Sequence, residues 1–172
     1  MLGIRTLTTF TTVVAAGIGG SGVLASDAAA DNRICRGSLG AVTVDDNVRV
    51  PRGATCTLTR TYVKGNIEVM SSATLVATRV RVDGNVQSQR GRRVIVRSSQ
   101  IDGNIQLDKV GGPILVVGNS VDGDIQLFAN RGRSEVRRNR VDGNLQCKSN
   151  RPAPMGGGNV VQGNKEDQCS RL

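Results

Sequence analysis

The sequence predicts an all-β, single-domain protein: a parallel β-helix (β-solenoid), in which one chain winds into stacked coils of short parallel strands. A heptad that recurs at a fixed spacing predicts this fold, together with apolar and polar residues that alternate within it. The third residue of the heptad is glycine in six copies, at positions 65, 84, 103, 123, 143 and 163, so the period is 19 or 20 residues. A unit of this length buries its apolar face only by stacking on its neighbours. We expect about six to seven coils.

The clear copies of the heptad occupy residues 63–69, 82–88, 101–107, 121–127 and 141–147, and a related segment at 44–50 carries Asp46 in the glycine column. Aliphatic residues hold its first and fifth positions and alternate with polar ones, as in Val121-Asp-Gly-Asp-Ile-Gln-Leu127. Alternation with period two indicates strands. A second apolar run follows in each coil, for example Val94-Ile-Val96, and Gly, Asn, Ser and Arg separate the runs as turn residues do. The expected coils are 44–62, 63–81, 82–100, 101–120, 121–140 and 141–160, with a partial coil at 161–172.

Other repeat folds fit the spacing less well. A left-handed hexapeptide helix would hold a strict period of about 18, a leucine-rich repeat would require leucine at several columns, and a propeller blade would need about twice the length. We therefore expect the right-handed form of the β-helix. The Asp-Gly-Asn tripeptide has two interpretations: a tight turn with glycine at positive φ, or a strand that continues through a small interior glycine. Turn chemistry is the favoured one.

The first 30 residues resemble a secretory signal peptide. Arg5 supplies the positive charge, an uncharged and moderately apolar stretch follows, and small residues permit cleavage after residue 25 or 30. A membrane anchor is the alternative, and the threonines and glycines of the stretch weaken it. The expected organisation is a signal peptide at 1–30, an N-terminal cap at 31–43, repeats at 44–160 and a C-terminal cap at 161–172.

The four cysteines agree with export, because disulfides persist in oxidising compartments. Cys35 and Cys56 are 21 residues apart, and Cys147 and Cys169 are 22 apart. Each separation is close to one coil, so the period favours these two pairs among the three connectivities that four cysteines allow. Zinc binding is the rival interpretation, but the chain has no histidine and no Cys-x-x-Cys spacing. The pairs would lie at the two ends of the stack and, with the Pro/Gly segment at 151–158, would protect the exposed strand edges there.

The chain is basic, with a net charge of +9. A basic exported surface attracts anionic polymers such as phosphate-bearing wall glycans, acidic polysaccharides, lipid headgroups or nucleic acid. Nucleic acid is not favoured, because no aromatic residues are interleaved for base stacking. The alternative is that the charge only keeps the protein soluble.

Arginines outside the heptads are the candidate anion-binding residues. Stacking would bring them onto one or two faces away from the Asp-Gly-Asn side, where guanidinium groups would bind phosphate or carboxylate in bidentate fashion. Solvated surface charge is the alternative. The candidates are Arg79, Arg81, Arg90, Arg92, Arg93, Arg97, Arg131, Arg133, Arg137, Arg138 and Arg140.

Two polar columns of the heptad have weaker functional interpretations. Asp45, Asp83, Asp102, Asp122 and Asp142 would stack about 5 Å apart, and a calcium ladder would relieve their repulsion. We favour solvated turn residues, because the sequence lacks a calcium-repeat signature, and we expect no metal and no cofactor. The Asn column (47, 66, 85, 104, 144 and 164, with Asp124) is most simply a ladder of amide hydrogen bonds from coil to coil. Facing outward, the Asp, Asn and Gln columns would instead form a flat grid for a repeating ligand such as a crystalline polysaccharide or ice.

No catalytic constellation is present in the sequence. Polysaccharide lyases and hydrolases built on right-handed β-helices use paired carboxylates, or calcium with an arginine base, in a cleft formed by long loops. This chain has almost no long loops, and only the Pro/Gly segment departs from the repeat. The sequence therefore predicts a protein that is not an enzyme.

The recurring [Val/Ile]-x-Gly-Asn-[Ile/Val/Leu] core resembles that of bactofilin-type β-helices, which are bacterial polymer-forming cytoskeletal proteins. The end of the chain, Gly163-Asn-Lys-Glu-Asp-Gln-Cys169, is similar to that of a group of small bacterial exported proteins. The second resemblance implies a secreted β-helix and supplies no activity. The first implies self-assembly, but the signal-like start, paired cysteines and expected caps depart from it.

We therefore expect a secreted or cell-envelope protein, monomeric and non-catalytic, that contacts an anionic envelope polymer or polysaccharide through its arginines. The alternative is a self-assembling, bactofilin-like scaffold. A polysaccharide-active β-helix enzyme is less favoured than either. No segment after the signal peptide is apolar enough to span a membrane.

Overall fold

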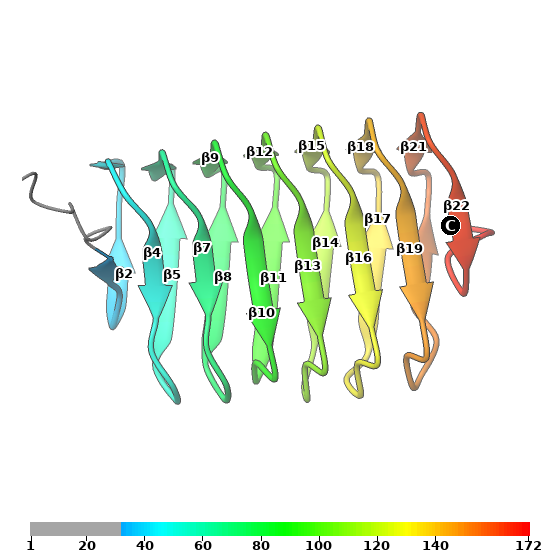
Figure 1. Cartoon of the computed structure of the whole chain (residues 1–172), viewed down its shortest axis with the longest axis horizontal. Helices are drawn as coiled ribbons and strands as arrows, with labels where there is room; N and C mark the ends of the chain where they lie inside the picture. Colours follow the sequence, from blue (N-terminus) through cyan, green and yellow to red (C-terminus); the bar gives the residue numbers. More distant parts are fainter. Residues whose placement is uncertain (1–31) are drawn as a thin grey trace, which may run out of the picture.

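The computed structural model describes residues 32–172, so the expected signal peptide lies outside the described residues. The described residues form 22 strands and no α-helix. The strands stack into three parallel sheets, one with eight strands and two with seven (Figure 1). The predicted β-solenoid is therefore confirmed. None of the described residues form a helix able to cross a membrane.

Each coil contributes one strand to each sheet. Sheet A contains β1 (Arg33–Ile34), β4 (Val48–Val50), β7 (Ile67–Val69), β10 (Val86–Gln89), β13 (Ile105–Asp108), β16 (Ile125–Phe128), β19 (Leu145–Lys148) and β22 (Lys165–Asp167). Sheet B contains β2 (Gly37–Leu39), β5 (Thr55–Thr59), β8 (Thr74–Thr78), β11 (Arg93–Arg97), β14 (Ile114–Val117), β17 (Ser134–Arg137) and β20 (Met155–Gly157). Sheet C contains β3 (Thr43–Val44), β6 (Tyr62–Val63), β9 (Arg81–Val82), β12 (Gln100–Ile101), β15 (Ser120–Val121), β18 (Arg140–Val141) and β21 (Val160–Val161).

The strands pair in register from coil to coil. Val86 lies opposite Ile105, and Ile105 lies opposite Ile125, so equivalent heptad positions stack directly. The pairing is parallel throughout. The period of the sequence is therefore the length of one coil, as predicted.

The core is a single apolar column inside the coils. Aliphatic heptad positions point inward and are fully buried, as Ile67, Ile105, Ile125 and Leu145 show. Burying a side chain of this size stabilises the fold by roughly 1.5–3 kcal/mol. One coil alone would leave much of this surface in water, and stacking buries it. The period-two pattern in the sequence arises because successive side chains of each strand point inward and outward in turn.

Three lines of turns run along the rod, and we name them by the sheets that they join. The AB edge comprises residues 35–36, 51–54, 70–73, 90–92, 109–113, 129–133 and 149–154. The BC edge comprises residues 40–42, 60–61, 79–80, 98–99, 118–119, 138–139 and 158–159. The CA edge comprises the Asp-Gly-Asn tripeptides and their equivalents, residues 45–47, 64–66, 83–85, 102–104, 122–124, 142–144 and 162–164.

The motif glycines lie at bends of the CA edge, but their φ angles are not positive, so that part of the prediction is wrong. Close approach requires them instead. A Cβ built at Gly103 would lie 2.6 Å from Asn85 Oδ1 and 2.7 Å from the carbonyl oxygen of Gly84. Real Cβ atoms do not approach so closely, so the backbones of successive coils exclude any side chain here. The Gly103 amide donates to that same Gly84 carbonyl, at 3.1 Å.

Left-handed residues occur at the other two edges, and most of them are not glycine. Each inner coil has one at the AB edge and one at the BC edge, for example Lys109 and Gly118 in the fourth coil or Ala129 and Arg138 in the fifth. A non-glycine residue in this region costs roughly 1–2 kcal/mol. The amide of Arg138 donates to the carbonyl of Gly157 in the next coil, at 3.1 Å, which offsets part of that cost.

Both predicted disulfides form, and they lie at the two ends of the stack. Cys35 bonds to Cys56, with 5.6 Å between their Cα atoms, and Cys147 bonds to Cys169, with 5.2 Å. Such bonds indicate an oxidising environment. Cys169 is fully buried, so the C-terminal turn covers the apolar column at that end.

Candidate anion-binding surface

The AB edge carries positive charge and, within the described residues, no carboxylate. Its cations stand on six of its seven turns, and two of these turns hold two cations each. They are Arg36, Arg52, Arg90, Arg92, Lys109, Arg131, Arg133 and Arg151. All eight are exposed. Lys109 pairs with Asp108 of β13, with 2.8 Å between Nζ and Oδ2, and the remaining seven form no ion pair with a described residue.

Small residues leave two hollows between these cations. One, of about 330 Å³, is lined by Arg90, Arg92, Lys109 and the glycines at 91, 111 and 112, with Ser72. The other, of about 470 Å³, is lined by Arg131 and Arg151, with Ala129, Asn130 and Ser149. Each hollow therefore places two or three cationic side chains around a space open to solvent. This arrangement suits an anionic group better than a neutral one.

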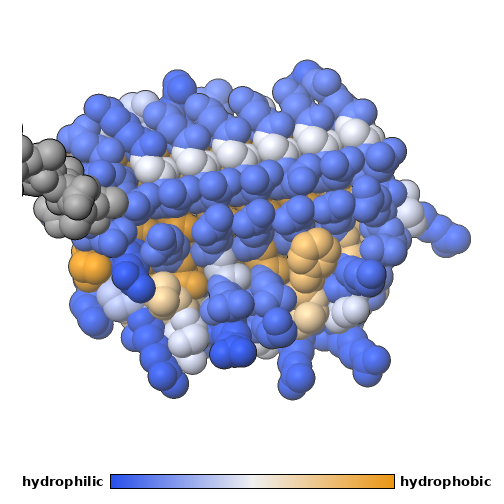
Figure 2. Space-filling view, viewed as in Figure 1, coloured by the Kyte–Doolittle hydropathy of each residue, from blue (hydrophilic) through white to orange (hydrophobic). Residues whose placement is uncertain are grey.

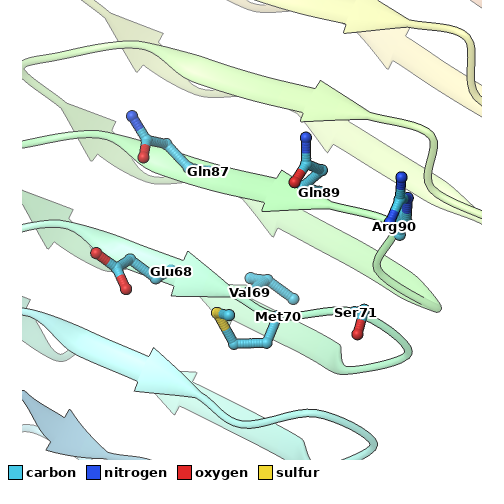
Figure 3. A pocket seen from close by; sticks show the side chains of 7 residues that line it. All are labelled: Glu68, Val69, Met70, Ser71, Gln87, Gln89 and Arg90. Carbon is cyan, nitrogen blue, oxygen red and sulfur yellow. The ribbon is translucent and has the colours of Figure 1, made fainter.

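A third hollow, of about 350 Å³, lies on sheet A beside the same edge (Figure 3). Glu68 and Gln87 project from neighbouring strands β7 and β10, and Arg90 stands at the turn that follows β10. Met70 supplies its apolar part. One carboxylate, amides and one guanidinium provide donors and acceptors of both signs, so this hollow has no net preference for anions.

The outer face of sheet B carries a second set of arginines. Arg93 and Arg97 flank Ile95 on β11, and two coils further along Arg137 lies on β17 with Arg133 just before it. Arg93, Arg97 and Arg133 form no ion pair with a described residue, and Arg137 pairs with Glu135. At the adjoining BC edge, Arg79 and Arg138 are exposed at left-handed turn positions.

The CA edge has the opposite charge. Its described turns hold the aspartates Asp45, Asp46, Asp83, Asp102, Asp122, Asp124 and Asp142, and one cation, Lys64. Lys64 Nζ lies 2.7 Å from Asp45 Oδ1. The hydrogen bond and the charge of Asp45 raise the pKa of Lys64 above its ordinary value.

Two of the predicted anion-binding residues lie on this acidic side, so the expectation that all of them stand away from it is wrong. Arg81 Nε lies 3.3 Å from Asp83 Oδ1, and its Nη2 lies 3.4 Å from Asp102 Oδ2. Arg140 Nε lies 3.6 Å from Asp142 Oδ1. Both occupy the outward position of sheet C directly before the heptad valine, so coil stacking places them beside the aspartates. Their charge is already paired.

Tyr62 joins the Arg81 cluster. Its hydroxyl donates to Asp83 Oδ2 at 2.6 Å, and the Arg81 guanidinium lies 5.4 Å from the centre of its ring. The hydrogen bond from Tyr62, followed by that from Arg81, holds the pKa of Asp83 below its ordinary value. The same bond to Asp83 raises the pKa of Tyr62. The hydroxyl, carboxylate and guanidinium groups satisfy one another's hydrogen bonds and charge, so we assign the cluster a structural role.

The aspartate column offers a cation no cage among the described residues. Asp45 contacts Lys64, Asp83 and Asp102 contact Arg81, and Asp142 contacts Arg140 and the side-chain amide of Gln162, whose Nε2 lies 2.7 Å from Asp142 Oδ1. Asp122 forms no ion pair with a described residue. Within residues 32–172, no group of three or more Asp, Glu, Cys or His side chains is placed to hold a metal ion. The contacts that four of these aspartates form are ion pairs and hydrogen bonds with neighbouring side chains.

The asparagine column of the CA edge forms the predicted ladder. Asn85 Oδ1 accepts a bond from the Asn104 amide at 2.8 Å and one from Asn104 Nδ2 at 3.1 Å, and the same pair of bonds recurs along the column. Asp124 Oδ1 accepts both bonds from Asn144, and the backbone amide of Asp124 donates to Asn104 Oδ1 at 2.7 Å, but the Asp124 side chain has no N–H to donate toward Asn104. These asparagines are half-buried except Asn164, which is exposed, and their hydrogen bonds join successive coils.

Two further asparagine ladders were not predicted from the sequence. One runs through Asn119, Asn139 and Asn159 at the BC edge, and the other through Asn130 and Asn150 at the AB edge. All five are buried. Their spacing of 20 residues was the available signal, but isolated asparagines between apolar runs also fit ordinary turns.

Sheet A presents straight rows of polar side chains along the rod. Figure 2 shows rows of similar hydropathy parallel to the long axis, and hydrophilic side chains project from the lower margin of this view. In the glutamine row, Gln126 Nε2 donates to Gln146 Oε1 at 2.8 Å, and Gln146 Nε2 donates to Glu166 at 2.9 Å. These amides bond to one another, which leaves them less free to bind a repeating ligand. The grid is therefore a weaker candidate site than the arginines.

No family model, curated protein or solved structure matches this chain. The site must therefore be interpreted from its own chemistry. The described molecule is a rod with cations on the AB edge, the outer face of sheet B and the BC edge, and with aspartates on the CA edge, four of them in ion pairs.

Proposed function

We propose that the protein is a non-catalytic binding module for an anionic polymer, which lies along the AB edge and the adjoining outer face of sheet B. The separation of charge between two edges of one rod carries the proposal. Among residues 32–172, the AB edge has eight cations and no carboxylate, whereas the CA edge has seven aspartates and one lysine. Random surface charge that served only solubility would mix the two signs on each edge.

The linear form of the site favours a polymer over a small anion. Successive coils lie about 4.8 Å apart, so the cations of neighbouring turns form a row parallel to the rod. Each exposed contact contributes little by itself, because water and salt screen it. A polymer that contacts several cations at once releases several counterions, which gives a useful affinity with a steep dependence on salt.

The proposal places the protein outside the cytoplasm, in the cell envelope or the medium. The two disulfides support this location, and so does the signal-like sequence at residues 1–30. Anionic glycans and polysaccharides are the abundant polymers there. The turns between successive described strands have six residues or fewer, which argues for binding without catalysis, because such turns build no enclosed cleft.

Salt-dependent binding by matched variants tests the proposal. The oxidised mature protein is sedimented with purified bacterial envelope, and separately titrated with heparin, from low to physiological salt. An AB-edge variant carries Arg90→Gln, Arg92→Gln, Arg131→Gln and Arg151→Gln. A control variant loses the same charge elsewhere, through Arg49→Gln, Arg81→Gln, Arg140→Gln and Lys165→Gln.

We expect the AB-edge variant to lose at least about tenfold in affinity, and the control variant much less. The salt slope should also fall in the AB-edge variant, because fewer counterions are released. Equal losses in the two variants would show that only net charge matters. Absence of binding by the natural sequence at low salt would refute the proposal.

Self-assembly is the second candidate, and the N-terminal end of the stack favours it. There β1, β2 and β3 are the outermost described strands of their sheets, and Ile34 and Val42 are 50% and 49% exposed. Against it stands Asp46, which occupies the glycine column in the first coil. In later coils a Cβ at this column would lie 2.4–2.6 Å from the Oδ1 of the coil before, so a second copy stacked in register would collide with Asp46. Sedimentation velocity over a hundredfold concentration range distinguishes a monomer from a growing polymer.

A further inference from the structure

We propose that the preferred polymer is a polysaccharide in which acidic and neutral sugars alternate, bound along the rod axis on the outer face of sheet B. This inference rests on the proposed function and names its ligand class. Its basis is an alternation of side chains from coil to coil, in which an arginine pair, an apolar strand and a second arginine pair follow one another.

The arginines form a four-cornered frame. Arg93 and Arg97 lie on one strand, four residues apart, which is about 13 Å along the strand. The register aligns Arg97 with Val117 and then with Arg137, so two coils separate the arginine pairs, or about 10 Å. Arg133 occupies the corresponding position opposite Arg93. All four side chains are exposed.

The strand between the arginine pairs is apolar on its outer side. Leu115 and Val117 point outward from β14 and are half-buried, and Pro113 precedes them. Ile95 of β11 lies opposite Leu115 but is only 3% exposed, so the apolar surface open to a ligand is that of Leu115 and Val117. A charged ligand group that met this strand would lose water and find no partner. The middle coil therefore selects a neutral unit.

A sugar chain fits this alternation. The ring of an extended, β-linked sugar advances by about the same distance as one coil of the rod, so one ring would meet one coil. Carboxylates of the acidic rings would accept bidentate bonds from the arginines. The neutral ring between them would place its CH face on Leu115 and Val117. Nucleic acid and polyphosphate carry charge on every unit and would leave the apolar strand against a charged group.

Three of the four arginines of the frame are free to receive such a ligand. Arg93, Arg97 and Arg133 form no ion pair with a described carboxylate. Arg137 is held by Glu135, whose carboxylate lies at the centre of its own coil. That negative charge would repel an anion at the centre and favours anions at the two flanks, where the other three arginines stand.

Three probes of different charge pattern test the inference. Hyaluronan oligosaccharides alternate glucuronate with N-acetylglucosamine, polygalacturonate oligosaccharides carry a carboxylate on every ring, and polyphosphate carries a charge on every unit. Affinities are measured by calorimetry at matched length and physiological salt. The variants are Arg93→Gln with Arg133→Gln, and Leu115→Thr with Val117→Thr. Thermal unfolding confirms that each variant is folded.

We expect hyaluronan to bind at least about tenfold more tightly than polygalacturonate, although it has half the charge per ring. Each double variant should remove this preference, and the Leu115→Thr, Val117→Thr variant should leave polyphosphate binding unchanged. Affinity that follows charge density alone, with polyphosphate the tightest, would overturn the inference and leave the proposed function standing. Binding of none of the probes, nor of envelope at low salt, would overturn both.

Discussion

The CA edge and the AB edge differ in sequence regularity and in charge. The CA edge repeats Asp-Gly-Asn almost without change, and each of its glycines faces the backbone of the preceding coil. The AB edge varies in length from two to six residues and in sequence from coil to coil. Its outward side chains are mostly arginine and lysine, and the CA edge carries most of the aspartates.

This difference indicates that residues repeated in every coil are those required for packing between coils. Positions that vary from coil to coil lie on the surface that is available for binding. At the CA edge, backbone contact and an amide ladder dictate the residue type in every coil. At the AB edge, only the buried positions are constrained, and the exposed ones are free to accumulate charge. The four predictions below test this division, in order of decreasing effect.

The largest effect is expected inside the AB edge, at Asn130. It is fully buried, and its Nδ2 donates to the carbonyl of Leu107 at 3.0 Å and to Asn150 Oδ1 at 2.8 Å, while its Oδ1 accepts from the Val110 amide. Asn130→Ala leaves these buried partners unsatisfied and should lower the free energy of unfolding by about 3 kcal/mol. Urea denaturation measures it.

The neighbouring Arg131 provides the control, because it is exposed and forms no ion pair with a described residue. Arg131→Ala should change stability by less than about 0.5 kcal/mol and should weaken binding to heparin. Equal destabilisation by the two variants would contradict the division of this edge into a buried, constrained side and an exposed, free side.

The next effect distinguishes two glycines of one coil. A Cβ at Gly103 would overlap the preceding coil, whereas the nearest atom to a Cβ at Gly111 is 4.0 Å away. Gly103→Ala should lower the free energy of unfolding by about 2 kcal/mol, because the backbones must separate. Gly111→Ala should leave stability unchanged or raise it by about 0.5 kcal/mol, because alanine restricts the unfolded chain. A Gly103→Ala protein as stable as the natural one would show that the coils shift without cost.

Much of the fold could be predicted from residue pattern. The glycine spacing gave the length of a coil, the alternation at Ile125 and Leu127 gave the inward positions, and the separation of Cys147 from Cys169 gave the disulfide. These features depend only on the conformation of one coil and on its regular repetition along the rod. The period of the sequence shows that repetition directly. The placement of Arg92, Arg93 and Arg133 away from the Asp-Gly-Asn side also followed from the period.

What could not be predicted depends on contacts between coils. The role of Gly103 required the position of Asn85 Oδ1 in the coil before it, since turn chemistry and close approach favour the same residue type. The burial of Asn130 and Asn139 depends on which way each side chain leaves a turn. The pairing of Arg81 with Asp83 depends on an outward position of sheet C adjoining the CA edge, and the sequence marks no such boundary.

A smaller gain in stability is expected from a substitution that restores the regular asparagine ladder of the CA edge. Asp124 is the carboxylate in this column of amides. Its backbone amide donates to Asn104 Oδ1, but its side chain cannot donate there as the Asn104 side chain donates to Asn85 in the coil before. Asp124→Asn should raise the free energy of unfolding by about 0.5–1 kcal/mol through one added hydrogen bond. Thermal unfolding compares the stability of this variant with that of Asp122→Asn. The control variant removes the same negative charge but at a position outside the ladder. Equal gains would show that reduced repulsion is responsible.

The smallest effect concerns the pH dependence of the paired charges on the acidic side. Because the Tyr62 hydroxyl and Arg81 lower the pKa of Asp83 in the folded protein, Asp83 contributes stability above its unfolded pKa, and this contribution is lost as pH falls through the folded value. Tyr62→Phe removes the largest cause, so the pKa of Asp83 should move back upward and the acid loss should begin at higher pH. Carboxyl NMR titration measures the shift. In an Asp83→Asn background the same Tyr62→Phe change should leave the pH dependence of unfolding unaltered, and a persisting change would assign the effect to another group.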